Sequence, residues 1–129
     1  MTEITKKFKI LLLINAIIGL SFAFFYLVVP YYYLSLIEWP FFDPYYSWAF
    51  GGVFLIFSSF LLRSIKQNHW EKCKSVLEIT IAWQILILIL NIISLIFIPT
   101  PIISIITIWI SNLMFITLIG LNFYFLRRN

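Results

Sequence analysis

The side chains that could bind a metal ion or act as nucleophiles are few and scattered along this 129-residue chain. His69 and Cys73 stand four residues apart, a spacing that places two metal ligands on one face of a helix. Glu71 points elsewhere on such a helix. No Gly-rich phosphate loop and no nucleophile elbow is present in the sequence. We therefore predict no catalytic residue, no metal site and no cofactor, with His69 and Cys73 in a solvated loop.

Three amide side chains, those of Asn15, Gln84 and Asn91, lie within long apolar stretches. A polar group inside a membrane is costly and usually faces other protein. Thr80, Gln84, Asn91 and Ser94 follow one another at spacings that place them on one helical stripe. We predict that Asn15, Gln84 and Asn91 form the polar interior of a helical bundle. They either bond helices together or line a route for a small polar solute.

Small and polar residues form similar stripes in the other apolar stretches. Asn15 lies beside a face of small residues, and Gly19 and Ala23 form a small-xxx-small pair that permits close helix approach. In the second stretch the expected inward face is formed by Ala49, Gly52 and Ser59. In the fourth it is formed by Ser104, Thr107, Ser111 and Asn122, with Asn112 at its edge.

An aromatic, proline-rich segment separates the first two apolar stretches and contains Glu38, Trp39, Asp43 and, at its end, Trp48. Aromatic rings with polar tips suit the membrane interface, so one interpretation is an interfacial belt. The other is a site for a hydrophobic or cationic ligand, because cations bind favourably over aromatic faces. In that second interpretation Glu38, Trp39, Asp43 and Trp48 are the ligand contacts, with the two acids as counter-charges.

The composition requires a membrane around the protein. The chain is 63% hydrophobic and 11% charged, too little polar surface to coat a soluble globule. The positive net charge does not indicate nucleic-acid binding, because the basic residues sit at the ends of apolar runs rather than on one basic face. The lipid bilayer is therefore the expected partner, with a second copy of the chain or another membrane protein as further candidates.

We predict an all-α fold, a single domain over residues 1–129 that forms an antiparallel four-transmembrane-helix bundle. Only helices or closed barrels satisfy the backbone in lipid, and the apolar runs are about twice as long as a barrel strand. The expected spans are about 8–29, 46–65, 76–98 and 102–126, with an outer aromatic loop at 30–45 and a cytoplasmic loop at 66–75. All five prolines lie outside these spans, where they break no helix.

The distribution of lysine and arginine predicts the orientation. The nine basic residues precede the first span, lie between the second and third, or close the chain: Lys6, Lys7, Lys9, Arg63, Lys66, Lys72, Lys74, Arg127 and Arg128. With four spans they all fall on one side, which the positive-inside rule makes cytoplasmic. We therefore expect a multi-pass protein of the cell membrane with both termini in the cytoplasm.

The layout resembles that of small uncharacterised four-span prokaryotic membrane proteins of the DoxX-like kind. The shared features are a basic start, a first span ending at Pro30, Asp43-Pro44 in the outer loop, Gly51-Gly52 opening the second span and Trp83 early in the third. The relatives usually carry an Arg just before the glycine of the second span, a position occupied here by the Trp48 to Phe50 segment. The resemblance implies the four-span fold and no particular activity.

Taken together, the residues predict a non-enzymatic membrane protein that acts through helix-helix, partner or lipid contacts. The alternative is a channel or carrier for a small neutral or hydrophobic solute that enters past the aromatic loop. An enzyme acting on lipids or quinones at that loop is a third, weaker alternative. No ionisable residue lies near the centre of a predicted span, which disfavours proton-coupled transport.

Overall fold

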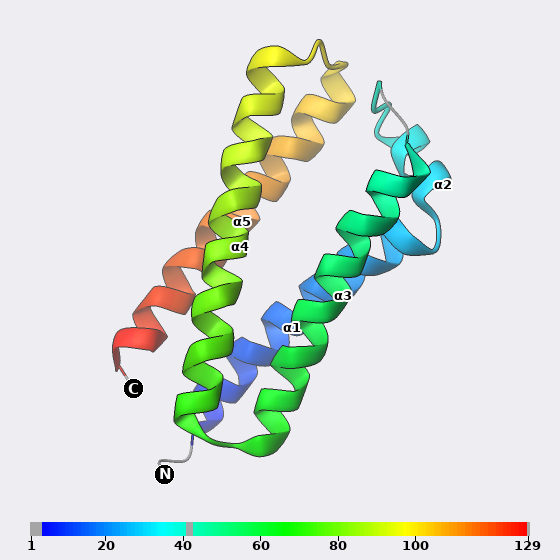
Figure 1. The fold of residues 1–129 in the computed structure, drawn as a ribbon. Coiled ribbons are helices and arrows are strands. Elements are labelled where there is room, and N and C mark those ends of the chain that lie inside the picture. Colours follow the sequence, from blue (N-terminus) through cyan, green and yellow to red (C-terminus); the bar gives the residue numbers. More distant parts are fainter. Residues whose placement is uncertain (1–3, 41–42, 129) are drawn as a thin grey trace.

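The computed structural model describes residues 4–40 and 43–128, and most of this length is helical (Figure 1). The helices of the described residues are α1 (Lys6–Leu27), α2 (Pro30–Leu36), α3 (Pro44–Gln67), α4 (Trp70–Phe97) and α5 (Ile102–Arg128). No strand occurs within the described ranges. The helices α1, α3, α4 and α5 are each long and apolar enough to cross a membrane. The predictions of an all-α protein and of four apolar helices are confirmed.

The ends of α3 follow from its capping residues. The Asp43 side chain accepts a hydrogen bond from the Tyr45 backbone N–H at 3.0 Å, which satisfies one of the free donors of the first turn. At the other end Asn68 adopts the left-handed conformation with φ of 57°, which terminates the helix. Only Asn68 and His69 separate α3 from α4. The turn is therefore shorter than the loop expected at 66–75, because both helices extend beyond the predicted spans.

The segment expected to be an outer loop contains the short helix α2. Pro30 occupies its first helical turn, where the missing N–H costs nothing. Tyr31 and Tyr32 are exposed, and Tyr33 is partly buried. The chain then continues through Ile37 to Pro40 before the N-terminus of α3.

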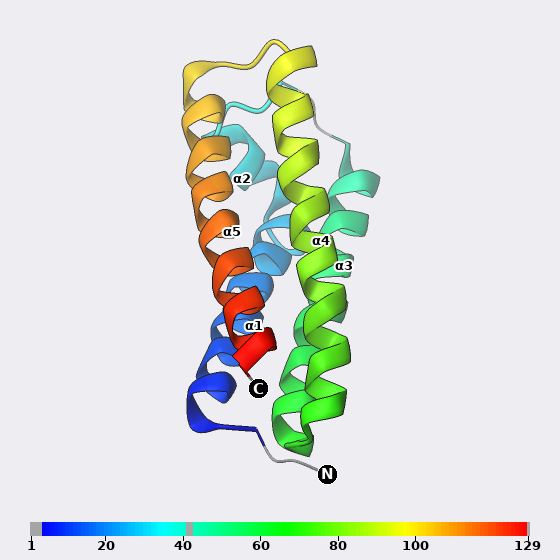
Figure 2. The same cartoon turned by 90° about the vertical axis from the view of Figure 1, so that its left-hand side faces the viewer.

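The four long helices lie side by side along one common axis (Figures 1 and 2). The most extensive pairing is that of α1 with α3, and α4 packs along α5 and more weakly on α3. Both ends of the chain and the turn between α3 and α4 lie at one end of the molecule, which we call the basic end (Figure 1). The helix α2 and the turn between α4 and α5 lie at the opposite end, the aromatic end.

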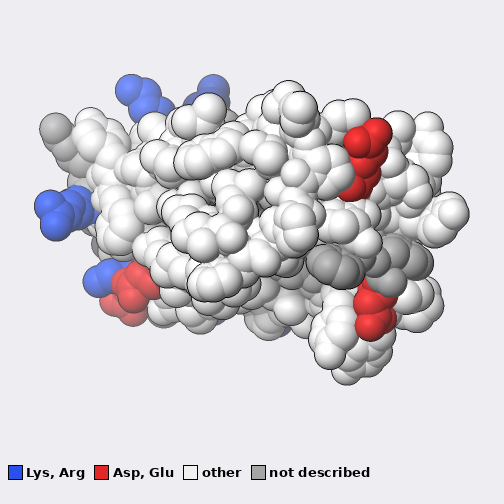
Figure 3. Space-filling view, turned by 90° about the horizontal axis from the view of Figure 1, so that it is seen from above, with Lys and Arg blue, Asp and Glu red and all other residues white. Residues whose placement is uncertain are grey.

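The charges of the described residues follow this division. The lysines and arginines belong to the first two turns of α1 and α4 and to the last two turns of α3 and α5. Figure 3, a view from above, shows basic groups on the left with an acidic group beside them, and two further acidic groups on the right. Glu38 and Asp43 are the acidic residues of the connection between α2 and α3.

Glycines allow the close packing of α1 against α3. A Cβ atom added to Gly19 would lie 2.1 Å from the Ser58 Oγ, and one added to Gly51 would lie 2.8 Å from the Tyr26 Cβ. Nothing lies within 4 Å of a Cβ added to Gly52. Each contact glycine thus brings the two helix backbones closer than a side chain would permit.

The face that α3 turns inward differs from the predicted one. Ser59 is exposed and Gly52 is only partly covered, so the expected inward stripe was wrong at these two positions. Ala49 is also exposed, although it lines a cavity between the helices. The buried residues of α3 are Ser47, Gly51, Phe54, Ser58, Leu61 and Ser64. They follow the same helical period on a different face, and the large residues Phe54 and Leu61 alternate with small ones.

An apolar cluster fills the bundle at the basic end. Its fully or almost fully buried side chains include Phe8, Leu12, Leu61 and Leu77. Cys73 belongs to this cluster, and its thiol donates a hydrogen bond to the Ser64 carbonyl at 3.3 Å. The prediction that Cys73 lies in a solvated loop was therefore wrong, because α4 begins early enough to carry it into the core.

Candidate functional site

Three amide side chains from three helices form a closed hydrogen-bonded cluster in the interior, which we call the amide triad. They are Asn15 of α1, Gln84 of α4 and Asn122 of α5, and each is at most 4% exposed. The Asn15 Oδ1 accepts from the Gln84 Nε2 at 2.9 Å and from the Asn122 Nδ2 at 3.1 Å. The Asn15 Nδ2 donates to the Asn122 Oδ1 at 2.9 Å, and the Asn122 Nδ2 also donates to the Gln84 Oε1 at 3.0 Å.

The amide triad closes the bundle toward the basic end. The second proton of the Asn15 amide is donated to the Leu11 carbonyl at 2.8 Å, so both of its N–H groups are used. All three amide oxygens accept at least one hydrogen bond. Between the triad and the basic end lies the apolar cluster that includes Phe8 and Leu12. No polar route continues through this half of the described structure.

Asn91 lies away from the other two predicted interior amides. It is only partly buried, and its Nδ2 donates to the Oδ1 of the fully buried Asn112 at 2.9 Å. The Asn112 Nδ2 has no hydrogen-bond partner among the described residues. The predicted set is thus divided: Asn15 and Gln84 meet in the triad, whereas Asn91 lines a cavity nearer the aromatic end.

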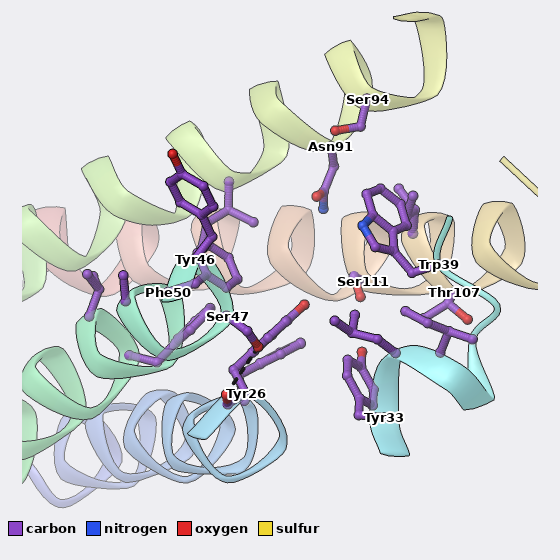
Figure 4. A pocket seen from close by; sticks show the side chains of 18 of the residues that line it. Tyr26, Tyr33, Trp39, Tyr46, Ser47, Phe50, Asn91, Ser94, Thr107 and Ser111 are labelled. Atoms are coloured by element: carbon purple, nitrogen blue, oxygen red, sulfur yellow. Dashed lines mark hydrogen bonds between the residues drawn. The ribbon is translucent and has the colours of Figure 1, made fainter. Parts of the chain in front are cut away.

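This aromatic cavity has a volume of about 610 Å³ and lies between α2 and the aromatic-end halves of the four long helices. Pockets for small molecules commonly have volumes of about 300–1,000 Å³ and mostly apolar walls. The aromatic residues that line it are Phe22, Tyr26, Tyr33, Trp39, Tyr46, Phe50, Phe54, Trp83 and Phe115. Figure 4 shows Tyr26 and Phe50 across the space from Asn91 and Ser111.

Ring contacts hold the aromatic wall in place. Tyr26 packs edge-on against Phe50 with ring centroids 4.9 Å apart, and Phe50 contacts Trp83 at 5.7 Å. Tyr33 packs edge-on against Tyr26 at 5.5 Å, which joins α2 to the same wall. The Ser47 hydroxyl donates to the Tyr26 carbonyl at 3.1 Å and fixes α3 against α1. These contacts preform this part of the wall, because each of the four rings packs against at least one of the others.

The opposite wall presents hydroxyl and amide groups from α4 and α5. The Ser94 hydroxyl donates to the Leu90 carbonyl and the Thr107 hydroxyl to the Ile103 carbonyl, each at 2.8 Å within its own helix. A hydroxyl that has donated its proton in this way still carries acceptor lone pairs. The Asn91 amide donates to Asn112 and likewise keeps its own oxygen as an acceptor. This wall therefore offers acceptor oxygens, and the second N–H of the Asn91 amide and the Ser111 hydroxyl add donors to it.

The four predicted contacts of the outer segment do not gather at one place. Trp39 and Asp43 line the aromatic cavity, whereas Glu38 and Trp48 do not. Trp48 is 52% exposed on the outside of α3, and Glu38 is exposed with φ of 55°. The structure thus places one of the two predicted counter-charges, Asp43, at the cavity.

Asp43 is exposed at the rim of the cavity. Its Oδ1 accepts a hydrogen bond from the Tyr45 N–H, and its Oδ2 has no hydrogen-bond or ion-pair partner among the described residues.

Burial raises the pKa of the nearby Tyr33 phenol above its ordinary value, although a side-chain hydrogen bond with Tyr26 offsets part of that rise. Tyr33 is therefore a neutral phenol at neutral pH and adds no negative charge to the cavity.

The sequence-based candidates omitted residues that the structure places at both sites. Asn122 completes the amide triad, and Tyr26, Tyr33 and Phe50 form much of the aromatic wall. Asn122 was on the predicted inward stripe of the fourth span, but nothing in that stripe identified its partners. The spacing of Tyr26 and Phe50 on either side of the outer segment gave a weak signal, since both lie one to two turns from its ends.

The hydroxyl of Ser104 on α5 donates to the Ile37 carbonyl at the end of α2. This bond joins the two sides of the cavity at the aromatic end. No protein-family model, curated protein or solved structure matches the chain. Any functional conclusion therefore rests on the geometry of the amide triad and the aromatic cavity.

Proposed function

We propose that the protein is a multi-pass protein of the cell membrane in which α1, α3, α4 and α5 form an antiparallel bundle with the basic end in the cytoplasm. The outward faces of the long helices support a lipid environment, since large apolar side chains such as Ile17 and Leu113 are 53% and 62% exposed. The positive-inside rule supports the orientation, because the lysines and arginines belong to helix ends at the basic end.

Cysteine labelling in intact cells tests this orientation. We expect Ser35→Cys, on exposed α2, to react with a membrane-impermeant maleimide added outside, and Lys74→Cys, on exposed early α4, to react only after lysis. The unsubstituted protein is the control, because its Cys73 is fully buried. The reverse labelling pattern would overturn the proposed orientation.

We propose that the function of this membrane protein is to bind a small, mostly apolar molecule in the aromatic cavity. The observation that carries the proposal is the cavity itself, about 610 Å³ of space within a wall of mutually packed rings. An apolar molecule placed there would replace lipid or water against those rings, and burial of apolar area is the main favourable term in such binding. The acceptor groups of α4 and α5 would orient it.

The amide triad favours ligand binding over the other expected functions. The interior amides Asn15 and Gln84 are hydrogen-bonded within the chain, so they are not available to hold a partner helix. The apolar cluster between the triad and the basic end also argues against an open channel. Transport would require α4 and α5 to move relative to α1 and α3, whereas binding from the aromatic end requires no such movement.

Filling the cavity tests the proposal. The neutral probe 2-neopentylnaphthalene is equilibrated with protein in phosphatidylcholine nanodiscs, and the probe taken up by empty nanodiscs is subtracted. We expect Ser111→Phe, at the cavity wall, to weaken binding at least tenfold, or about 1.4 kcal/mol. Thr117→Phe is the matched control, because Thr117 is exposed on the same helix and does not line the cavity.

Equal effects of the two phenylalanine substitutions would contradict binding in the cavity. Absence of saturable binding to the unsubstituted protein, above that of empty nanodiscs, would do the same. Thermal unfolding of both variants measures whether either substitution has disturbed the fold.

A further inference from the structure

The polar wall of the aromatic cavity can accept hydrogen bonds from an occupant. The Ser94 and Thr107 hydroxyls have donated their protons to carbonyls of their own helices, and Asn91 donates to Asn112. These groups still offer acceptor oxygens, beside the second N–H of the Asn91 amide. A positively polarised or donor head can therefore bind to oxygens on this wall.

The aromatic wall points to the same class of ligand. The faces of Trp and Tyr rings attract cations by about 0.5–2 kcal/mol each, most strongly where water is excluded. Trp39, Tyr33 and Tyr46 line the cavity on the side of α2 and the start of α3. Trp39 and Tyr46 lie close to Asp43 in the sequence, and Tyr33 belongs to the preceding helix, α2.

The charge distribution reinforces this match. Asp43 is a lining residue with a carboxylate oxygen that no described residue neutralises. The basic side chains belong to helix ends at the basic end, and no Lys, Arg or His is among the residues that line the cavity. An anionic occupant would therefore be buried without a counter-charge, whereas a cation finds one at the rim.

We infer that the occupant of the aromatic cavity is an amphipathic organic cation, with its apolar body against the aromatic wall and its positive head beside Asp43. This inference rests on the proposed function and names the class of ligand that the site takes. From Asp43 to Phe54 the cavity follows about 16 Å of α3, at 1.5 Å per residue. A fused-ring or short aliphatic body fits along a length of this size, beside the charged head.

A pair of probes with the same shape and different charge separates the contribution of the charge from that of the rings. The cation (2-naphthylmethyl)trimethylammonium and the neutral 2-neopentylnaphthalene differ only in the exchange of a quaternary nitrogen for a carbon. Both are measured by equilibrium dialysis against protein in zwitterionic phosphatidylcholine nanodiscs, with empty nanodiscs subtracted. A permanently charged head keeps the comparison independent of ligand protonation.

The informative variant is Asp43→Asn. Asn caps a helix as well as Asp does, so the variant keeps the hydrogen bond to the Tyr45 N–H and removes only the charge. We expect it to weaken binding of the cation about tenfold, as expected for loss of one partly screened charge pair, and to leave binding of the neutral probe unchanged. Glu38→Gln is the matched control, because Glu38 lies in the same connection outside the cavity lining.

Each result of this experiment decides a separate point. A loss for the cation alone, in Asp43→Asn alone, supports the inference. An unchanged affinity of Asp43→Asn for the cation, or an equal loss in Glu38→Gln, overturns it while binding of the neutral probe still supports the cavity as a site. Failure of both probes to bind the unsubstituted protein overturns the proposed function and this inference together.

Discussion

Replacement of Asn15 by Leu is expected to lower the free energy of unfolding by about 2–3 kcal/mol, because it removes the central member of the amide triad. The Gln84 Nε2 would lose its acceptor at 2.9 Å, and the Asn122 side chain would lose both its hydrogen bonds to Asn15. These groups would remain buried where no water can replace the lost partner. The measurement is SDS-induced unfolding in mixed micelles, followed by tryptophan fluorescence.

The triple variant Asn15→Leu, Gln84→Met and Asn122→Leu gives the sharper test. Removal of all three amides leaves no unsatisfied group, so we expect a stability within about 1 kcal/mol of the unsubstituted protein. Thr117→Val is the control, because its exposed hydroxyl bonds only to the Leu113 carbonyl of its own helix. A triple variant as unstable as the sum of its single substitutions would show that the triad does not act as one unit.

The second large effect is expected at Gly51. A Cβ there would lie 2.8 Å from the Tyr26 Cβ, 2.9 Å from the Leu27 Cγ and 3.2 Å from the Leu27 backbone nitrogen. These atoms belong to the backbone or lie close to it, so they cannot swing aside as the end of a long side chain would. Gly51→Ala is therefore expected to destabilise the protein by about 2 kcal/mol through overpacking.

The neighbouring glycine provides a control at the next position of the same helix. A Cβ added to Gly52 meets nothing within 4 Å, so Gly52→Ala is expected to be neutral or to gain up to about 1 kcal/mol from helix propensity. The same micelle unfolding assay measures both variants. Similar stability of the two alanine variants would contradict the close packing of α1 against α3 at this position.

The helical fold class could be predicted because it depends on local properties of the chain. Long apolar runs determine where spanning helices form, and prolines outside those runs leave the helices unbroken. Pro30 and Pro44 mark the first turns of α2 and α3, where proline is favoured. The helix α2 and the early start of α4 at Trp70 were less predictable, because neither is marked by a strong change in hydropathy.

The candidate sites were predictable only in part, because they depend on how each helix is rotated against its neighbours. The stripe that contains Gln84 was correctly expected to face inward, but its partner Asn122 is 38 residues away in the sequence. The inward face of α3 was assigned to Gly52 rather than Gly51, and one residue on a helix corresponds to a rotation of about 100°. Hydropathy cannot fix that rotation where all faces of a helix are apolar.

The aromatic cavity is also formed by contacts between residues that are distant from one another in the sequence. Asp43 and Phe115 line the same space, although they are far apart along the chain. Their meeting depends on the pairing of α1 with α3 and of α4 with α5. From the sequence, Asp43 and Glu38 were equivalent candidates for a counter-charge. The path of the chain after α2 places Asp43 at the cavity and leaves Glu38 outside its lining.

In the membrane location that we propose, the closed hydrogen bonding of the amide triad would have a bioenergetic consequence. Polar clusters at the centre of a bundle attract water, and files of water conduct protons and dissipate the electrochemical gradient. Side-chain amides carry no proton that titrates at neutral pH, and here they are bonded mainly to one another. The triad thus supplies polar cohesion between three helices, and in the proposed membrane it would add no titrating group through which protons could leak.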